Sequence, residues 1–285
     1  RFWQMTYALL GGLSNIIADE DVTLGGRLLS DEGKIDGVPS KEWLETVKSE
    51  LKHSENVRVF NRTTVTGVYD GGTFGALERV SHHIADRPNG LVQDCFWRIV
   101  AKRTILASGA LERFIAFANN DRPGILLSSA IEKYANLFGV ACGEKNVLFT
   151  NNDSAYETAI SLFQKGINIE AIVDNREEID SKLIKETEKN NIKVYKGYTV
   201  VDTSGYKRIN KISIMQLSKD GQKVMGSKVS IICDCLGISG GWTPAVHLFT
   251  QSGGKLKFRD EDQVFIPDIY PSDQISIGSC NGDFT

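Results

Sequence analysis

The sequence holds few of the residues that build disulfide scaffolds and metal sites. Its five cysteines, Cys95, Cys142, Cys233, Cys235 and Cys280, are scattered over 285 residues and form no C-x-x-C pair. So few thiols indicate a reducing, cytoplasmic location, and they exclude the redox centre of a disulfide reductase. The four histidines show no metal-ligand spacing, so we expect no metal site.

Long apolar runs and excess charge are also absent. No apolar run reaches the roughly 18 residues of a membrane span, so we expect no membrane contact. A net charge of −3 provides no attraction to nucleic acid. The 41% hydrophobic and 24% charged composition is typical of a globular protein with one large or two medium domains. The chain has no starting Met, so we expect that Arg1 is not the native start.

Strand and helix patterns alternate along the chain, which predicts an α/β fold. Residues 39–53 have apolar side chains at helical spacing, with Ser40 as the expected N-cap. Residues 56–70 alternate as one extended strand. Residues 126–139 predict a helix that ends at Gly139.

A second unit begins at Lys145. A strand, a turn with a helix, and a second strand ending at Asp174 have the size of a βαβ unit, with an acid about twenty residues after the turn. Side chains of residues 151–156 stand where glycines would let the backbone approach a phosphate. Asp153 there either repels a phosphate or caps the helix. Both interpretations predict a second dinucleotide site that is vacant or altered.

Cys233 and Cys235 are separated by one residue inside an apolar run. We expect both on one face of a strand, since side chains alternate along a strand. They are interpreted as small core residues, with a redox pair as the alternative.

Residues 16–20 read as a short apolar strand that ends in two acids, Asp19 and Glu20. In a dinucleotide fold, the acid at the tip of the second strand accepts hydrogen bonds from ribose hydroxyls. Acids there favour the unphosphorylated ribose of NAD or FAD. Gly25 and Gly26 permit either close approach of a ligand or a tight turn.

Two later strands run into small residues. Residues 104–113 pass through Ser108 and Gly109, and residues 275–285 pass through Gly278 and Gly282. Such turns admit a cofactor, and their amides are suited to face a pyrophosphate or ribityl chain.

The first expected dinucleotide unit lacks the glycine-rich turn and helix that normally begin it. Gly12 of the pair Gly11–Gly12 precedes Asp19 by only seven residues, and a G-x-G-x-x-G turn with its helix does not fit there. Either residues are absent from the numbered chain or the chain has a real deletion. We expect absent residues.

The strings ILASGALER, GISGGWTP and ISIGSCNG, in this order after Asp19, resemble the two-dinucleotide-domain flavoproteins built like glutathione reductase. Longer strings, RTTVTGVYDGGTFGALERVSHH, FTNNDSAY and SGGWTPAVHL, resemble the α subunits of the heterotetrameric sarcosine oxidases. The resemblance covers essentially the whole chain. It implies two Rossmann-like domains, the second inserted in the first: residues 1–122 with 246–285, and residues 123–245.

The resemblance also implies a function. The chain would be the cofactor-binding, amino-proximal part of a subunit whose complex demethylates sarcosine to glycine, reduces O2 to H2O2 and passes the one-carbon unit to tetrahydrofolate. It would hold NAD, with FAD as the alternative, while FMN and FAD lie mainly on the partner β subunit; γ and δ subunits complete the complex. Tetrahydrofolate would bind a carboxy-terminal half outside this chain. No catalytic residue is implied, so we expect no amine oxidation by the chain alone. The implied cofactor-binding residues are Asp19, Glu20, Gly25, Gly26, Arg27, Thr64, Val65, Ser108, Gly109, Gly278 and Gly282.

Three alternatives remain at this point. The chain is a self-contained NAD(P)H-dependent flavin oxidoreductase, a subunit of a related amine or opine dehydrogenase or oxidase, or a scaffold that has lost its nucleotide. The absent C-x-x-C pair and the altered second turn count against the first of these.

Overall fold

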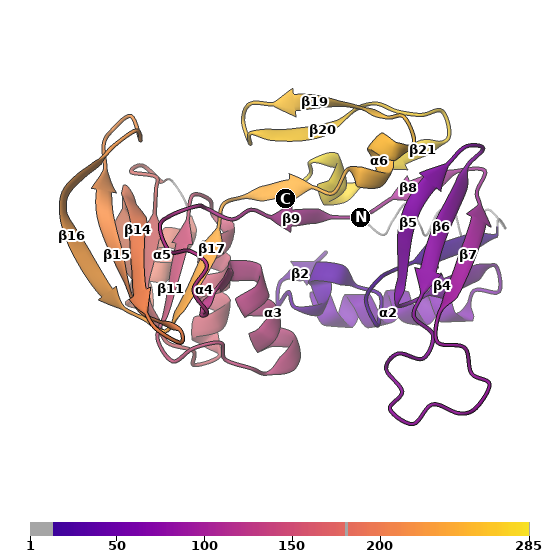
Figure 1. Cartoon of the computed structure of the whole chain (residues 1–285), viewed down its shortest axis with the longest axis horizontal. Coiled ribbons are helices and arrows are strands. Elements are labelled where there is room, and N and C mark those ends of the chain that lie inside the picture. Colours follow the sequence, from indigo (N-terminus) through magenta and orange to yellow (C-terminus); the bar gives the residue numbers. More distant parts are fainter. Residues whose placement is uncertain (1–13, 180–181, 285) are drawn as a thin grey trace. The chain divides into compact units, whose positions relative to one another are not determined.

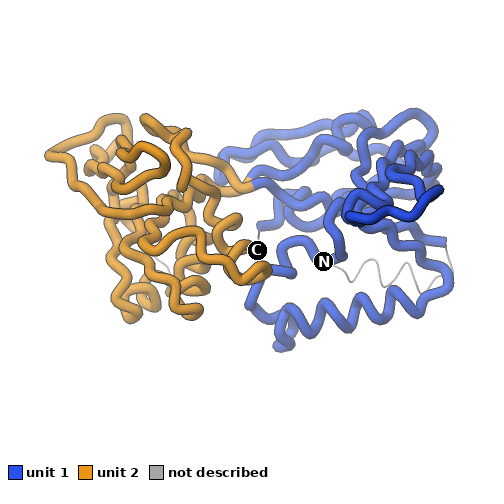
Figure 2. The backbone as a smooth tube through the Cα atoms, turned by 60° about the horizontal axis from the view of Figure 1, so that its bottom comes forward, with its two compact units in different colours: residues 1–111, 243–285 blue, residues 112–242 orange. Residues whose placement is uncertain are grey.

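The chain forms two compact units, and the computed structural model describes residues 14–179 and 182–284 of them (Figure 1). Unit 1 comprises residues 1–111 and 243–285, and unit 2 comprises residues 112–242 (Figure 2). The chain passes between the units in two paired strands, β9 and β18. Gly11 and Gly12 lie outside the described residues.

The described residues of unit 2 form three helices and the longest strands. Its elements are β10 (Ile125–Leu127), α3 (Ser128–Phe138), β11 (Asn146–Thr150), α4 (Ser154–Gln164), β12 (Ile169–Asp174), α5 (Lys182–Lys189), β13 (Lys193–Lys196), β14 (Tyr198–Gly205), β15 (Ile209–Leu217), β16 (Val224–Ile232) and β17 (Cys235–Ser239).

A five-stranded parallel sheet forms the middle layer of unit 2, in the order β10-β17-β11-β12-β13. One face packs against α3, α4 and α5, and the other packs against the antiparallel sheet β14-β15-β16. Because both faces are covered, every residue of β11 and β17 is buried. Gly237 of β17 is required by packing, since a Cβ there would lie 2.4 Å from Leu148 and 2.9 Å from Ile131.

Unit 1 is built from smaller pieces. Its elements are β1 (Asn15–Ala18), η1 (Gly26–Leu29), β2 (Lys34–Ile35), β3 (Val38–Pro39), α2 (Ser40–His53), β4 (Val57–Phe60), β5 (Thr63–Tyr69), β6 (Thr73–Glu78), β7 (Cys95–Val100), β8 (Thr104–Leu106), β9 (Ala110–Glu112), β18 (Trp242–Pro244), α6 (His247–Gln251), β19 (Lys255–Arg259), β20 (Val264–Ile269), β21 (Gln274–Ser276) and η2 (Gly278–Asn281), of which β9 and β18 cross the unit boundary.

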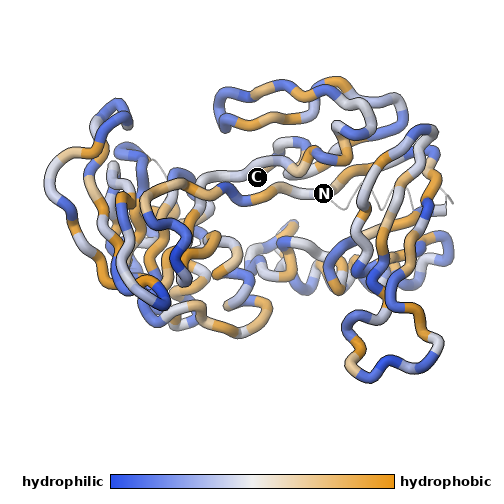
Figure 3. Tube along the Cα trace, in the orientation of Figure 1, coloured by the Kyte–Doolittle hydropathy of each residue, from blue (hydrophilic) through white to orange (hydrophobic). Residues whose placement is uncertain are grey.

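Two parallel strand pairs, β1-β4 and β8-β21, form the core of unit 1. The first pair packs its buried Ile17 with Leu51 of α2. The second pair packs Leu106 with Phe249 and Cys280. An antiparallel meander, β5-β6-β7, and the hairpin β19-β20 complete the unit. The loop that joins β6 to β7 is mostly hydrophilic, with short hydrophobic stretches (Figure 3).

The helix expected over 39–53 is confirmed as α2, but Ser40 is not its N-cap. Ser40 is the first helical residue, and its Oγ donates to the carbonyl oxygen of Gly33 at 2.8 Å. The single strand expected over 56–70 is wrong as well. The chain breaks after β4, because Arg62 has a φ of 52°, which no strand accommodates.

The helix expected at 126–139 is confirmed as α3, with Gly139 left-handed at its end. The βαβ unit β11-α4-β12, ending at Asp174, is also confirmed.

Cys233 and Cys235 do not share a face. The amides of Asp234 and Cys235 both donate to the carbonyl oxygen of Lys145, so the chain bends there from β16 into β17. Cys233 consequently packs on the side of the antiparallel sheet, and Cys235 packs on the helical side. Both thiols are free and buried.

Of the helices in residues 14–179 and 182–284, none combines the length and apolar character that crossing a membrane requires.

Candidate functional site: the carboxyl ends of the parallel strands

Asp19 lies at the carboxyl end of β1, where the sequence placed it. Its amide donates to the carbonyl oxygen of Phe60 at 2.9 Å, and its own carbonyl oxygen accepts from the amide of Thr63 at 2.8 Å. Its Oδ1 accepts from the amide of Asp21 at 2.9 Å, which holds the half-buried carboxylate in a turn. Glu20 beside it is exposed. Two carboxylates therefore mark the end of this strand, one fixed and one exposed to solvent.

The loop that follows contains Gly25 and Gly26, and the structure explains each of these glycines differently. Gly25 has a φ of 141°, and a Cβ there would lie 2.6 Å from Cδ2 of Leu44 on α2. This φ and the packing against Leu44 account for Gly25 without a ligand. Gly26 has a φ of 51° and no atom within 4 Å of its Cβ position, so the space beside it is open to a ligand. Arg27 is the second residue of η1 and is exposed.

Thr64 and Val65 lie on β5, directly after the amide of Thr63 that binds Asp19. Both are half-buried and pair with Leu77 and Ala76 of β6. The structure therefore brings these two residues to the same strand end as Asp19.

The remaining expected residues form a second group at the carboxyl ends of β8 and β21. The amide of Ile277 donates to the carbonyl oxygen of Leu106, which places Gly278 beside the turn through Ser108 and Gly109. Ser108 donates its hydroxyl to the carbonyl oxygen of Ala245 at 2.7 Å. Gly109 has a φ of 75° with open space at its Cβ position. Gly109 thus resembles Gly26 in leaving room for a ligand.

Gly282 is explained by packing. It ends η2 with a φ of 86°, and a Cβ there would lie 2.7 Å from Ile266. Its carbonyl oxygen accepts from Nη2 of Arg259 at 2.8 Å. Gly278 is buried and has a φ of 65° at the start of the same turn.

The equivalent position in unit 2 is Asp174, at the carboxyl end of β12, and it is fully buried. Its Oδ1 accepts from the backbone amide and Nε of Arg176, at 2.9 and 3.1 Å. Its Oδ2 accepts from Nη2 of Arg176 and from the hydroxyl of Tyr156, at 2.8 and 2.9 Å. These four bonds use the acceptor capacity of the carboxylate, so it has none left for a ribose.

Asp174, Arg176, Asp153 and Tyr156 form a cluster in which the opposite charges stabilise one another. Burial, reinforced by the Asp174 carboxylate, raises the pKa of Tyr156 well above its usual range. Burial alone would lower the pKa of Arg176, but its bonds to Asp174 and its pairing with Asp153 at 2.8 Å raise it. Asp153 occupies the N-cap position of α4 as expected, but its carboxylate makes no cap bond there and pairs with Arg176 instead.

The turn after β11 is closed by side chains. Nδ2 of Asn152 donates to the carbonyl oxygen of Ser239 at 2.9 Å, and Oδ1 of Asn152 accepts from the amide and hydroxyl of Ser154. Nε1 of Trp242 donates to the hydroxyl of Ser154 at 3.3 Å. These bonds fill the space beside the turn where a dinucleotide fold admits phosphates.

The sequence did not predict that Tyr156 and Arg176 bond to Asp174, or that Ser239 bonds to the turn after β11. The partners are brought together by the fold: Tyr156 lies 18 positions from Asp174, and Ser154 lies 85 positions from Ser239. Only the two-residue spacing of Asp174 and Arg176 was a local signal.

Burial raises the pKa of Cys233 and of Cys235 to about 12, so neither thiol is a nucleophile near neutral pH. Across the residues that the structure describes, no three His, Cys, Asp or Glu side chains gather as a metal site.

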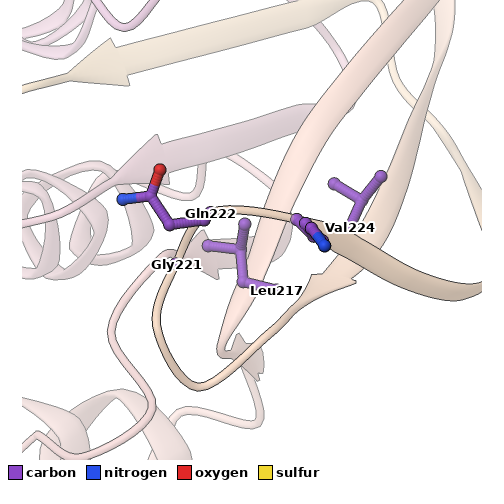
Figure 4. A pocket seen from close by; sticks show the side chains of 5 residues that line it. Leu217, Gly221, Gln222 and Val224 are labelled. Carbon is purple, nitrogen blue, oxygen red and sulfur yellow. The ribbon is translucent and has the colours of Figure 1, made fainter.

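Among the described residues, unit 2 carries two surface hollows that contain none of the expected residues. The larger, about 500 Å³, lies at the turn between β15 and β16 and is lined by Leu217 and residues 221–224 (Figure 4). The smaller, about 290 Å³, includes Arg208 and its ion-pair partner Asp234. Neither includes an expected cofactor-binding residue.

Comparison with known proteins shows which proteins this chain is similar to. No family model matches the chain. The α subunit of sarcosine oxidase from Rhizobium meliloti (strain 1021) is 36% identical over 261 residues, which is 90% of this chain. That of Corynebacterium sp. (strain P-1) is 34% identical over 278 residues, or 96% of this chain. The chain is a relative of the sarcosine oxidase α subunit. It spans 24% and 28% of the length of these two proteins.

Solved structures show the fold of this sarcosine oxidase relative. L-proline dehydrogenase from P. horikoshii matches with a TM-score of 0.66 at 22% identity, over 93% of this chain and 45% of that one. Thioredoxin reductase from T. acidophilum matches with a TM-score of 0.67 at 16% identity, over 98% of this chain and 86% of that one. The expected α/β fold with Rossmann-like domains is confirmed.

Proposed function

We propose that this chain is the cofactor-binding portion of a sarcosine oxidase α subunit. The complex would oxidatively demethylate sarcosine to glycine, reduce O2 to H2O2 and pass the one-carbon unit to tetrahydrofolate. The partner β, γ and δ subunits would complete it in the cytoplasm, with FAD and FMN mainly on the β subunit. Similarity to named α subunits over at least 90% of the chain supports this proposal.

Unit 1 is the proposed dinucleotide site. The carboxylates of Asp19 and Glu20 follow a parallel strand, where a nucleotide fold binds ribose hydroxyls. Gly26 and Gly109 have open space at their Cβ positions, so the backbone there can approach a ligand closely. The observation that carries the assignment is the combination of strand-end carboxylates with an open glycine, Gly26, in the loop that follows them. The residues described fit the ribose edge of the group.

The charges at this edge select the nucleotide. Two carboxylates repel the 2′-phosphate of NADP and accept hydrogen bonds from the two free hydroxyls of an NAD ribose. We therefore propose NAD for unit 1, with FAD as the alternative. When bound, a pyridine dinucleotide supplies hydride chemistry. No residue of the chain is proposed as a catalytic acid or base, and we expect no amine oxidation by the chain alone.

Unit 2 is proposed to hold no dinucleotide. The saturated carboxylate of Asp174 and the side-chain bonds of Asn152 support this assignment. The stoichiometry would be one dinucleotide per chain.

A graft into a working relative tests the function. This chain replaces the aligned 261-residue segment of the Rhizobium meliloti α subunit, and the other subunits are co-expressed. We expect a complex that produces H2O2 with sarcosine, whereas the ungrafted chain produces none. An assembled graft complex that leaves sarcosine unoxidised would refute the proposal.

A further inference from the structure

The sequence contains the pair Asn-Gly twice, at Asn89–Gly90 and at Asn281–Gly282. The two residues of such a pair can react with each other, because a glycine has no Cβ to shield its backbone amide nitrogen from the asparagine side chain. Attack of that nitrogen on Cγ of the asparagine closes a five-membered ring. The rate depends on how firmly the fold holds the two reacting groups, and the structure holds the two pairs differently.

The first pair lies in the loop that joins β6 to β7 and projects from the end of the meander (Figure 1). Asn89 and Gly90 are the central residues of a turn, in which the amide of Leu91 donates to the carbonyl oxygen of Pro88 at 3.2 Å. Gly90 has a φ of 86°, close to the value that a type II turn requires at its third position. All four residues are exposed. The bond that closes this turn is therefore open to water.

Both reacting groups of the first pair are free. Among the residues that the structure describes, the side chain of Asn89 makes no hydrogen bond and the amide of Gly90 donates to no acceptor. Apart from its chain neighbours, no described atom lies within 4 Å of the Cβ position of Gly90. Rotation of the backbone here brings the nitrogen of Gly90 to Cγ of Asn89, at the cost of a solvent-exposed hydrogen bond.

The base of the same loop is fixed, in contrast to the turn. The amide of Ser81 donates to the carbonyl oxygen of Gln93 at 3.2 Å, and its hydroxyl donates to that of Val92 at 2.9 Å. Nε2 of His82 lies 2.7 Å from Oδ1 of Asp94. These bonds separate the turn from β6 and β7, so a chemical change in the turn leaves the meander intact.

The second pair is held by the fold. The amide of Gly282 donates to the carbonyl oxygen of Ser279 at 3.1 Å, and its carbonyl oxygen accepts from Nη2 of Arg259 at 2.8 Å. Oδ1 of Asn281 accepts from the hydroxyl of Tyr270. Gly282 is also buried. Both reacting groups are engaged elsewhere, so they can approach each other only after the turn has opened.

We propose that Asn89 is a site of spontaneous deamidation in the folded protein, whereas Asn281 is protected. The deprotonated amide nitrogen of Gly90 attacks Cγ of Asn89, the new N–Cγ bond forms, and the side-chain nitrogen takes up protons from water and leaves as ammonia. Water then opens the succinimide at either carbonyl, which yields aspartate or isoaspartate. The reaction consumes one water and releases one ammonia. The loop gains a negative charge, and isoaspartate also lengthens the backbone of the turn by one carbon.

Ageing of the folded 285-residue chain tests the proposal. The chain is incubated at mildly alkaline pH, which favours the deprotonated amide, and peptides that contain each pair are followed by mass spectrometry for the replacement of NH2 by OH. Asn89 should react at least about tenfold faster than Asn281, because a bonded and buried site reacts only after local opening. In concentrated urea, which unfolds both turns, the two rates should converge.

Asn89→Gln is the matched control, because its longer side chain closes a six-membered ring much more slowly. It should abolish the mass change in the loop peptide and leave the rate at Asn281 unchanged. Asn89→Asp, which supplies the charge of the product, should leave the unfolding temperature unchanged, and a clear decrease would contradict a change confined to the turn. The proposal is overturned by equal rates at the two pairs in the folded chain. It is also overturned if Asn89 reacts only in urea, or if the ratio of the two rates is the same in folded and unfolded chains.

Discussion

Removing the guanidinium of Arg176 should destabilise unit 2 more than any exposed ion pair does. Arg176→Ala deletes the cation that pairs with the buried carboxylate of Asp174 and leaves that charge in the interior. Breaking one side of a buried pair typically costs about 3–5 kcal/mol, and because the Arg176 side chain is 32% exposed we expect a cost of about 3 kcal/mol. Tyr156→Phe, which removes one hydrogen bond to the same carboxylate, should cost about 1.5–3 kcal/mol.

The matched control is Arg208→Ala, which breaks an arginine–aspartate pair in the same unit. The side chain of Arg208 is 61% exposed, and its pair with Asp234 at 3.1 Å should contribute no more than about 1 kcal/mol. Because the chain has two units, unfolding in urea should be monitored by hydrogen exchange of peptides from β12 and α4. These peptides report on unit 2 alone. Equal costs for Arg176→Ala and Arg208→Ala would refute the structural role of the cluster.

Three further predictions concern single sites. The amides of Glu144 and Lys145 and the charge of Arg208 outweigh the effect of burial and lower the pKa of Asp234. A lowered folded-state pKa stabilises above the ordinary aspartate pKa of about 3.9, and this is lost as pH falls through the folded value. Asp234→Asn should therefore cost stability at pH 7, and the difference from wild type should shrink in urea titrations below about pH 4; a constant difference contradicts this. Gly25→Ala should cost about 1–3 kcal/mol by thermal unfolding, because of its φ and the contact with Leu44, whereas Gly221→Ala, with open space, tests the φ penalty alone. Finally, Cys233 and Cys235 should react with maleimide at pH 8 only after unfolding, and rapid native labelling of either would count against their burial.

Local patterns predicted the elements whose stabilisation is local. Helical spacing with a terminal glycine gave α3, and the βαβ pattern located Asp174 at its strand end. The prediction failed where a single backbone angle or a tertiary contact determines where a strand ends or which face a side chain occupies. Arg62 divides the strand expected over 56–70, and a bend at Asp234, whose amide donates to the carbonyl oxygen of Lys145, separates Cys233 from Cys235.

The candidate site divides in the same way: features set by local sequence were predicted, and features set by tertiary contacts were not. The position of Asp19 at the end of β1 follows from the apolar run before it. That Gly25 serves α2 packing while Gly26 leaves open space depends on Leu44, which lies nineteen positions later. The cluster around Asp174 depends on partners distant in sequence, so no spacing rule could have shown that its acceptors are all used.

The central claim is that unit 1 alone holds NAD, through Asp19 and Glu20. The most direct measurement is the identity and amount of nucleotide released from the denatured graft complex, by mass spectrometry. The claim predicts one NAD per graft, bound at least about tenfold more weakly after Asp19→Asn with Glu20→Gln, and unchanged in the control Asp70→Asn. Asn retains the acceptor that holds the turn at Asp21, so a weaker affinity reports on the ligand rather than on the loop. A graft that releases no NAD, or a double variant that binds it as tightly as before, would contradict the claim.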